Sequence, residues 1–309
     1  MSKYALTVEN LTKVYSDSKN KKENKALNNL NFQVKQGEVF GLLGPNGAGK
    51  TTFLNILGGT VSKTQGNINV WGFDLDKNPR QVKASIGIVP QEVNLDAFFS
   101  PKKLLELQAG LYGIPKKDRI TDLILKMVAL ENKAYAYSRS LSGGMKRRLL
   151  IAKAMVHQPP ILILDEPTAG VDVELRKILW KNVKELNKEG VTIILTTHYL
   201  FEAQEMCDRI AIIDKGNLVA LDTTQKLLDR IQTKKISFKV KEIDVHQELK
   251  MKGIQIKINS SDSILITYEK NSLNFEEIIN YLSQNNIRIL DIITEDGDLE
   301  DVFVQLTNN

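Results

Sequence analysis

The most informative stretch of the sequence begins at residue 39 and reads VFGLLGPNGAGKTTFLNIL. The apolar run Val39–Leu43 predicts a buried strand of a parallel sheet, and the apolar spacing of Phe53–Leu57 predicts a helix. Between them, Gly44–Thr51 fits the pattern G-x-x-x-x-G-K-[ST]. Glycines let backbone N–H groups converge on phosphates at a helix N-terminus, where Lys50 can reach the β- and γ-phosphates and the following threonine can bind Mg²⁺. The stretch therefore predicts a phosphate-binding loop.

A second apolar run, Ile161–Leu164, ends in two acids, Asp165 and Glu166. Carboxylates at the carboxyl edge of a sheet are costly to bury unless they meet a cation or a reacting water. We expect Asp165 to lie on the Mg²⁺ side of the phosphates and Glu166 to orient the attacking water as a general base. Considered alone, the pair could equally be two strand-end acids exposed to water.

Residues 141–145 read LSGGM, and a basic, helical run follows them. A serine followed by glycines predicts a helix N-terminus that an anion can approach closely. Ser142, Gly143 and Gly144 are therefore candidates for a second phosphate-binding helix start. Alone, the pattern describes an ordinary capped helix. Because one nucleotide needs only one cradle, the second poses a geometric question.

The composition is that of a globular protein. Of the 309 residues, 42% are hydrophobic and 26% are charged. This length predicts about two domains. The formal net charge of +5 is small and dispersed, so we expect no nucleic-acid partner.

Residues 1–10 lack the apolar region of a secretory signal, and no run approaches the ~18 consecutive apolar residues of a membrane span. The single cysteine, Cys207, excludes an intrachain disulfide and is expected to be a small buried hydrophobic residue. We therefore expect a cytosolic chain without disulfides.

Alternating strands and helices predict an α/β fold with a mostly parallel sheet. Strands at 161–164 and 191–195 flank an amphipathic helix, and a hairpin around Asp214–Asn217 closes the core. Nearer the N-terminus, Tyr4–Val8 alternates like an edge strand, and a solvated hairpin excursion over Ser16–Lys25 precedes the next strand. Phosphate contact by the lysines of this excursion is the less favoured interpretation.

Two further parts of the chain are predicted: a helical subdomain and a small domain that combines strands and helices. Over about residues 92–145 we expect an inserted helical subdomain, because apolar residues recur at helical spacing. The residues of that pattern are Leu104, Leu107, Leu111, Leu123, Met127 and Leu130. Composition changes near Asp222, which predicts a first domain over 1–222. A strand, strand, strand, helix, strand, helix pattern then predicts a small α+β domain over 223–309.

The motifs and their order resemble the nucleotide-binding subunit of an ATP-binding cassette (ABC) transporter. The matching stretches are a Walker A loop (44–51), a Q-loop glutamine (Gln91), the signature (141–144), Walker B ending in Asp165 and Glu166, a D-loop (169–172) and a switch histidine (His198). The resemblance covers residues 4 to about 220. It implies a P-loop NTPase fold with a RecA-like core, an antiparallel β subdomain and the inserted helical subdomain.

The resemblance also implies roles for single residues and answers the geometric question. In this family two subunits dimerise head to tail, so that Ser142 and Gly144 of one chain close on ATP held by Lys50 of the other. ATP and Mg²⁺ are the implied cofactors. Catalytic roles fall to Glu166, His198, Lys50 and Gln91, and metal-binding roles to Thr51, Gln91 and Asp165. The implied ATP-binding residues are Tyr15, which would stack on adenine, and Gly44, Pro45, Asn46, Gly47, Ala48, Gly49, Lys50, Thr51, Thr52, Ser142, Gly143 and Gly144.

The implied activity is ATP hydrolysis that drives transport through a separate membrane permease. The permease would dock on a groove between the core and the helical subdomain and hold a homodimer at the cytoplasmic face of the membrane. Phe98 and Phe99 could anchor a permease helix, although burial in the subdomain fits them as well.

Two departures from the commonest family pattern point to one branch. Met145 stands where the family usually has glutamine, and Leu299–Phe303 reads LEDVF. Both resemble the subunits of ABC-2 type exporters, which include drug, polysaccharide and lipid-linked systems. The alternative is a soluble ABC ATPase of translation or DNA maintenance. One cassette without a coiled-coil insertion favours transport.

Overall fold

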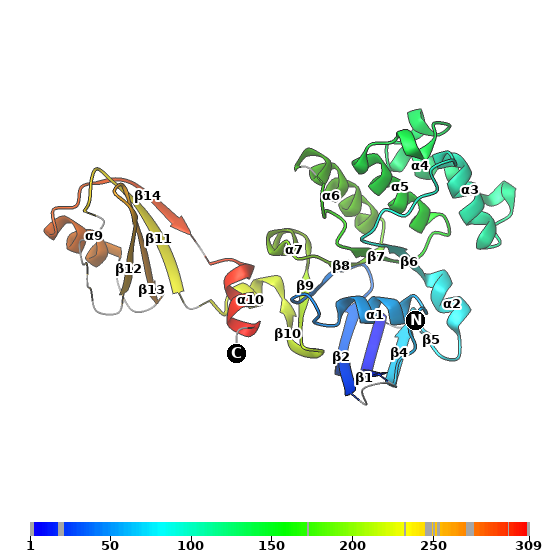
Figure 1. Cartoon of the computed structure of the whole chain (residues 1–309), viewed down its shortest axis with the longest axis horizontal. Helices are drawn as coiled ribbons and strands as arrows, with labels where there is room; N and C mark the ends of the chain where they lie inside the picture. The colour runs from blue at the N-terminus through cyan, green and yellow to red at the C-terminus, as the bar shows by residue number, and fades with distance from the viewer. Residues whose placement is uncertain are drawn as a thin grey trace. The chain divides into compact units, whose positions relative to one another are not determined.

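A computed structural model describes residues 3–17, 22–171, 173–231, 233–244, 249, 251, 254–269, 275–295 and 297–307 (Figure 1). Asp172, the last residue of the predicted D-loop, lies outside this set. The chain divides into two compact units, Met1–Thr224 and Gln225–Asn309. None of the helices formed by the described residues has the length and apolar character that crossing a bilayer requires.

A six-stranded sheet forms the centre of the first unit (Figure 1), with the strand order β10-β9-β3-β8-β7-β6. The strands are β3 (Val39–Leu43), β6 (Ile86–Val89), β7 (Ile161–Asp165), β8 (Thr192–Thr196), β9 (Arg209–Asp214) and β10 (Asn217–Thr223). Neighbours pair in parallel except in the β9–β10 hairpin. Every residue of β3 and β8 is buried, as strands covered on both faces should be. The predicted parallel sheet is confirmed.

The helices α1 (Lys50–Leu57), α6 (Val173–Lys188) and α7 (Leu200–Met206) follow strands β3, β7 and β8 along the chain. Each strand-to-helix connection therefore leaves the carboxyl edge of the sheet. Loops at that edge are where open α/β sheets place their ligands.

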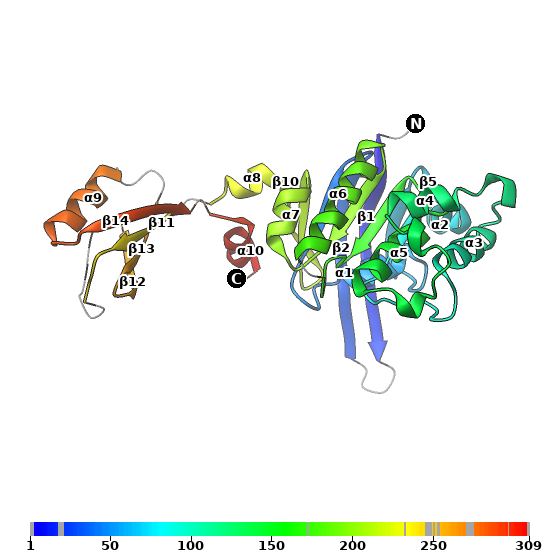
Figure 2. The same cartoon turned by 90° about the horizontal axis from the view of Figure 1, so that it is seen from above.

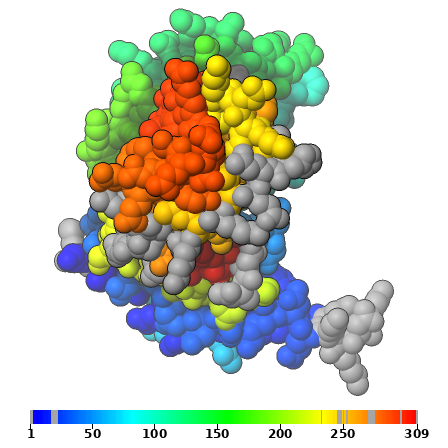
Figure 3. All heavy atoms as spheres, turned by 90° about the vertical axis from the view of Figure 1, so that its left-hand side faces the viewer, coloured from blue at the N-terminus to red at the C-terminus, as the bar shows by residue number. Residues whose placement is uncertain are grey.

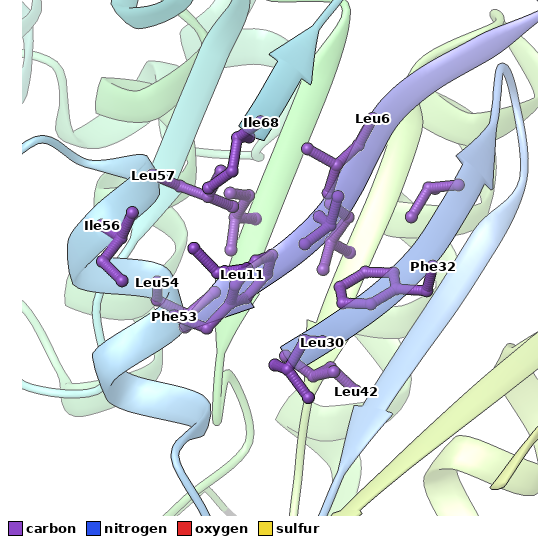
Figure 4. Packing of buried hydrophobic residues seen from close by; sticks show 14 of the residues in the cluster. Leu6, Leu11, Leu30, Phe32, Leu42, Phe53, Leu54, Ile56, Leu57 and Ile68 are labelled. Carbon is purple, nitrogen blue, oxygen red and sulfur yellow. The ribbon is translucent and has the colours of Figure 1, made fainter. Parts of the chain in front are cut away.

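A second sheet in this unit is antiparallel and has the order β2-β1-β4-β5. Its strands are β1 (Tyr4–Asp17), β2 (Lys22–Lys35), β4 (Gln65–Val70) and β5 (Phe73–Asp74). Figure 4 shows Leu11 and Leu30 of this sheet facing Phe53 of α1, and these side chains belong to one buried cluster. The helix that follows the phosphate-binding loop is thus held from both sheets.

One prediction about the N-terminal strands is wrong. β1 is not an edge strand, because it lies between β2 and β4. The hairpin predicted over Ser16–Lys25 is confirmed: Tyr15 pairs with Asn24 and Ser16 with Glu23, so both strands run on as one long hairpin (Figure 2). Backbone hydrogen bonding extends this ladder regardless of side-chain polarity.

The helix α2 (Pro79–Ser85) packs with the two sheets, because its Val82 belongs to their buried cluster. The helical part contains α3 (Pro101–Leu111), α4 (Thr121–Met127), α5 (Gly143–Met155) and three short 3-10 turns (Lys116–Asp118, Glu131–Lys133, Ser138–Ser140). Its core is formed by a cluster that includes Leu105, Leu125 and Leu149. The predicted apolar face is partly wrong, because Leu107, Leu111 and Leu123 are exposed. Both residues of the apolar pairs 104–105 and 124–125 are buried, so the buried face of each helix is rotated by one residue from the predicted face.

The second unit is an antiparallel sheet with the order β12-β13-β11-β14. Its elements are α8 (Thr224–Leu228), β11 (Thr233–Val240), β12 (Ile254–Ser260), β13 (Ser263–Glu269), α9 (Phe275–Gln284), β14 (Ile289–Glu295) and α10 (Leu299–Thr307). Phe238, Ile266 and Leu282 share its core, which joins α9 to one face of the sheet. The outer surface of α9 is drawn in orange at the front of Figure 3.

Candidate active site

A cavity of about 920 Å³ lies where the phosphate-binding loop meets the carboxyl ends of β7 and β8. It brings together residues that are far apart in the sequence. The predicted site residues in its lining are Tyr15, Asn46, Gly47, Ala48, Gly49, Lys50, Thr51, Thr52, Gln91, Asp165, Glu166 and His198. Ser142, Gly143 and Gly144 are not in this lining.

The loop takes its shape from glycines with positive φ. Gly47 and Gly49 have φ values of 81° and 111°, which glycine adopts at little cost. A Cβ on Gly49 would also lie 2.6 Å from the carbonyl oxygen of Ala26 in β2. The hairpin therefore packs directly against the loop and requires glycine at this position.

Lys50 begins α1 and is only 8% exposed. Its Nζ donates to the carbonyl oxygens of Gly44 (2.7 Å) and Pro45 (3.1 Å), two predicted site residues of the loop that are not in the cavity lining. Burial lowers the pKa of Lys50, and the charges of Glu166 and Asp165 oppose that shift. The loop thus holds a buried cation at the floor of the cavity, close to two acids.

Glu166 follows β7 with a left-handed φ of 46°. Gln91 donates from Nε2 to its Oε2 at 2.9 Å, and Nδ1 of His198 lies 3.1 Å from the same oxygen. The backbone N–H of Glu166 donates to the carbonyl oxygen of Thr196 at 3.0 Å. Two other predicted catalytic residues therefore orient this carboxylate, so it is not a strand-end acid exposed to water.

Asp165 is the last residue of β7, and its Oδ1 accepts a hydrogen bond from the Thr196 hydroxyl. With Thr51 and Gln91 it contributes hydroxyl, amide and carboxylate oxygens to one cavity, the donor types that Mg²⁺ prefers. The described residues hold no cluster of three His, Cys, Asp or Glu side chains suited to a metal. Mg²⁺ bound with nucleotide phosphates needs only one or two protein ligands, so this donor set fits.

The signature residues begin α5. Ser142 is its N-cap and accepts a hydrogen bond from the backbone N–H of Met145 at 3.3 Å. A Cβ on Gly143 would meet nothing within 4 Å, so this helix start is open to an approaching group. Within a single chain it is a capped helix apart from the cavity.

Lys25 lines the cavity from the hairpin, which favours the phosphate contact that was the less favoured interpretation of its lysines. Three other features of the site were missed by sequence reasoning. Thr196 joins Asp165 to the backbone of Glu166. Lys215 lines the cavity from the β9–β10 turn. The buried Arg147 donates to backbone carbonyls of two loops beside the cavity. The sequence showed only that residues 146–148 are basic. Which of them points inward depends on how α5 packs.

A scan against family models matches residues 27–169 to the family described as ABC transporter. A linearmycin resistance ATP-binding protein of Bacillus subtilis (strain 168) is 39% identical over 229 residues, covering 73% of this chain and 71% of that protein. A Nod factor export ATP-binding protein I of Rhizobium etli is 34% identical over 310 residues, covering 98% of this chain and 93% of that protein.

Solved structures give the same result. A dimeric ATP-binding cassette in a post-hydrolysis state with bound ADP and Pi superposes with a TM-score of 0.62 at 27% identity, over 71% of this chain and 98% of that one. The cbiO1 protein of Clostridium perfringens, part of the ABC transporter complex cbiONQ, has a TM-score of 0.65 at 30% identity, over 74% of this chain and 92% of that chain.

Proposed function

Because the chain belongs to the ABC transporter family, we propose that it is the ATP-hydrolysing subunit of an exporter and acts as a head-to-tail dimer beneath a separate permease. The observation that carries the site assignment is one cavity lined by Lys50, Asp165 and Glu166, in which Gln91 and His198 both contact the Glu166 carboxylate. The names of the relatives, a resistance protein and Nod factor export proteins, favour export. A soluble ATPase of translation or DNA maintenance is not favoured.

ATP enters with its phosphates against the loop amides at the start of α1. Lys50 then exchanges its bonds to the Gly44 and Pro45 carbonyls for phosphate oxygens, which costs little because the ammonium is already buried beside the loop. Tyr15 lines the same cavity, and with its side chain 40% exposed it has a free face for adenine.

Hydrolysis needs a water molecule in line with the γ-phosphate. Glu166 orients that water and accepts its proton as the water oxygen bonds to phosphorus and the bond to the β–γ bridging oxygen breaks. His198 and Gln91 hold the carboxylate in place for this step. Thr51 and Asp165, with Gln91, would hold Mg²⁺, which supplies charge stabilisation to the phosphates when bound.

The open N-terminus of α5 completes the site in the dimer. Ser142, Gly143 and Gly144 of one subunit close on the γ-phosphate of ATP in the other, so that each of two sites draws on both chains. The dimeric relative with bound ADP and Pi supports this arrangement. Dimer closure and opening would then follow ATP binding and product release.

A groove of about 450 Å³ lies between the end of β6 and the helical part, and we assign the permease contact to it. Ile88, Tyr112 and Leu150 give it an apolar surface, and Lys83 and Lys153 make it basic. Phe98 and Phe99 follow Asn94 of its lining by four and five residues and are 71% and 37% exposed, which rules out their burial in the subdomain core. Exposed aromatic side chains suit a helix of a membrane partner, so we include them in the proposed contact.

The test is purification of tagged Glu166→Gln protein from detergent-solubilised cells with ATP present, because this variant should bind ATP and nearly stop turnover. We expect a stoichiometric membrane protein with several spans to remain bound. Phe98→Ala with Phe99→Ala should release it while the nucleotide still binds. Ribosomal or DNA-repair proteins in place of a membrane partner would contradict the transporter assignment.

A further inference from the structure

Arg147 is a charged residue that α5 buries. It lies on α5, five positions after the N-cap Ser142, and is 4% exposed. Burial lowers its pKa, and the charges of Asp165 and Glu166 oppose that shift. Burying a guanidinium costs free energy that an apolar side chain would avoid, so its placement calls for a role.

The contacts of Arg147 point to that role. Its Nη1 donates to the carbonyl oxygens of Pro90 (2.9 Å) and Gln91 (2.5 Å), and its Nη2 donates to the carbonyl oxygen of Ala169 (3.4 Å). One side chain thus joins α5 to the loop after β6 and to the loop after β7.

The loop after β7 contains Glu166, and the loop after β6 contacts its carboxylate. The Gln91 side chain donates to its carboxylate at 2.9 Å, and the backbone N–H of Ala169 donates to its carbonyl oxygen at 3.2 Å. When ATP binds and replaces these contacts, either loop can shift. Such a shift would move the Arg147 guanidinium, which is bonded to both loops. Because a helix is stiff, a pull on Arg147 moves the N-terminus of α5 as well.

We propose that Arg147 is a positioning residue that couples the nucleotide cavity of a subunit to the Ser142 end of its own α5. This inference rests on the head-to-tail dimer, in which that helix end belongs to the opposite ATP site. ATP in one site then prepares the other, and the two sites hydrolyse ATP cooperatively.

The neighbouring Arg148 offers a matched control. Its Nη1 donates to the carbonyl oxygens of Val128 (2.7 Å) and Ala129 (2.9 Å), both in the helical part. Arg148 therefore has the same chemistry on the same helix, with bonds to a loop that does not touch Glu166.

The experiment measures ATP hydrolysis against ATP concentration for the full chain and its Arg147→Met and Arg148→Met variants. It also measures ATP affinity at dilutions that keep the protein monomeric. We expect Arg147→Met to keep the monomer affinity within about twofold while its Hill coefficient falls from a value near the two-site limit to about one. Arg148→Met should remain as cooperative as the unmodified chain, and Arg147→Lys should recover part of the loss.

Two results separate the failures. If the unmodified chain and Arg147→Met are equally cooperative, the coupling through Arg147 is overturned but the dimer is not. The same holds if Arg148→Met loses as much cooperativity as Arg147→Met. An unmodified chain that hydrolyses ATP as a dimer but without cooperativity would overturn the link, and one that hydrolyses ATP as a monomer would overturn the dimer and the link with it. If Arg147→Met does not fold, the Hill coefficients of the charge-conserving variants Arg147→Lys and Arg148→Lys are compared in the same way.

Discussion

At the scale of single residues, the site depends on groups whose surroundings determine what they can do. Glu166 has two neighbours on one carboxylate oxygen, so the same acid that would be free at a strand end is oriented. The motifs predicted the types and order of these residues, because binding phosphate, binding Mg²⁺ and orienting water each require particular side chains. The contacts of Thr196 and Arg147 were not, because they depend on register and on helix rotation in the folded chain.

Gly49→Ala should destabilise the protein by about 2 kcal/mol and abolish ATP binding. The side chain would force a φ of 111° on a non-glycine residue and push a Cβ to within 2.6 Å of the Ala26 carbonyl oxygen. Urea unfolding and a nucleotide-binding assay measure both effects. Gly143→Ala is the control for stability, because its Cβ meets nothing within 4 Å. Equal stability losses for the two variants would contradict the loop geometry.

Lys50 should leave a signature in the pH dependence of stability. Its pKa lies below the ordinary 10.5 in the folded state, so the unfolded chain binds more protons just below that pH. The free energy of unfolding of the unmodified chain, less that of Lys50→Met, should therefore rise as the pH is raised toward 10.5. Denaturant titrations of both proteins at several alkaline pH values measure this difference. A constant or falling difference would show that Lys50 is not buried as described.

At the scale of elements, the sequence predicted most strands and helices because apolar runs and periodicities are local signals. β3 and β6 end where the apolar runs end. The β1–β2 hairpin was predicted, but the length of its strands was not, because its outer part is polar and is held by backbone pairing. The buried face of the helical part was misjudged because neighbouring apolar residues compete for it and only packing decides.

Leu105→Ala should cost about 3 kcal/mol of stability, whereas Leu111→Ala should change it by less than about 0.5 kcal/mol. Leu105 is fully buried and Leu111 is 83% exposed on the same helix, α3. Chemical denaturation of both variants tests the corrected face of the helical part. If Leu111→Ala lost more stability than Leu105→Ala, the buried face predicted from the sequence would be right and the corrected one wrong.

At the scale of the whole molecule, two units with separate cores make up the chain. The first contains every residue assigned to the ATP site. The Rhizobium etli relative covers 98% of the chain, so both units recur together in an export ATP-binding protein. The central claim also belongs to this scale: a complete ATP site needs two copies of the first unit, because the described chain separates its signature from its own cavity.

Mixing two inactive variants tests that claim most directly. Lys50→Ala destroys the loop side of a site and Ser142→Arg destroys the signature side, so each homodimer should be nearly inactive. In a head-to-tail heterodimer both lesions fall in one site and leave the other intact. An equimolar mixture should therefore regain activity, up to about a quarter of the unmodified ATPase rate, because half of the dimers are mixed and each has one of two sites. Cooperativity between the two sites lowers the regained rate below that limit. A mixture no more active than its components would contradict the account.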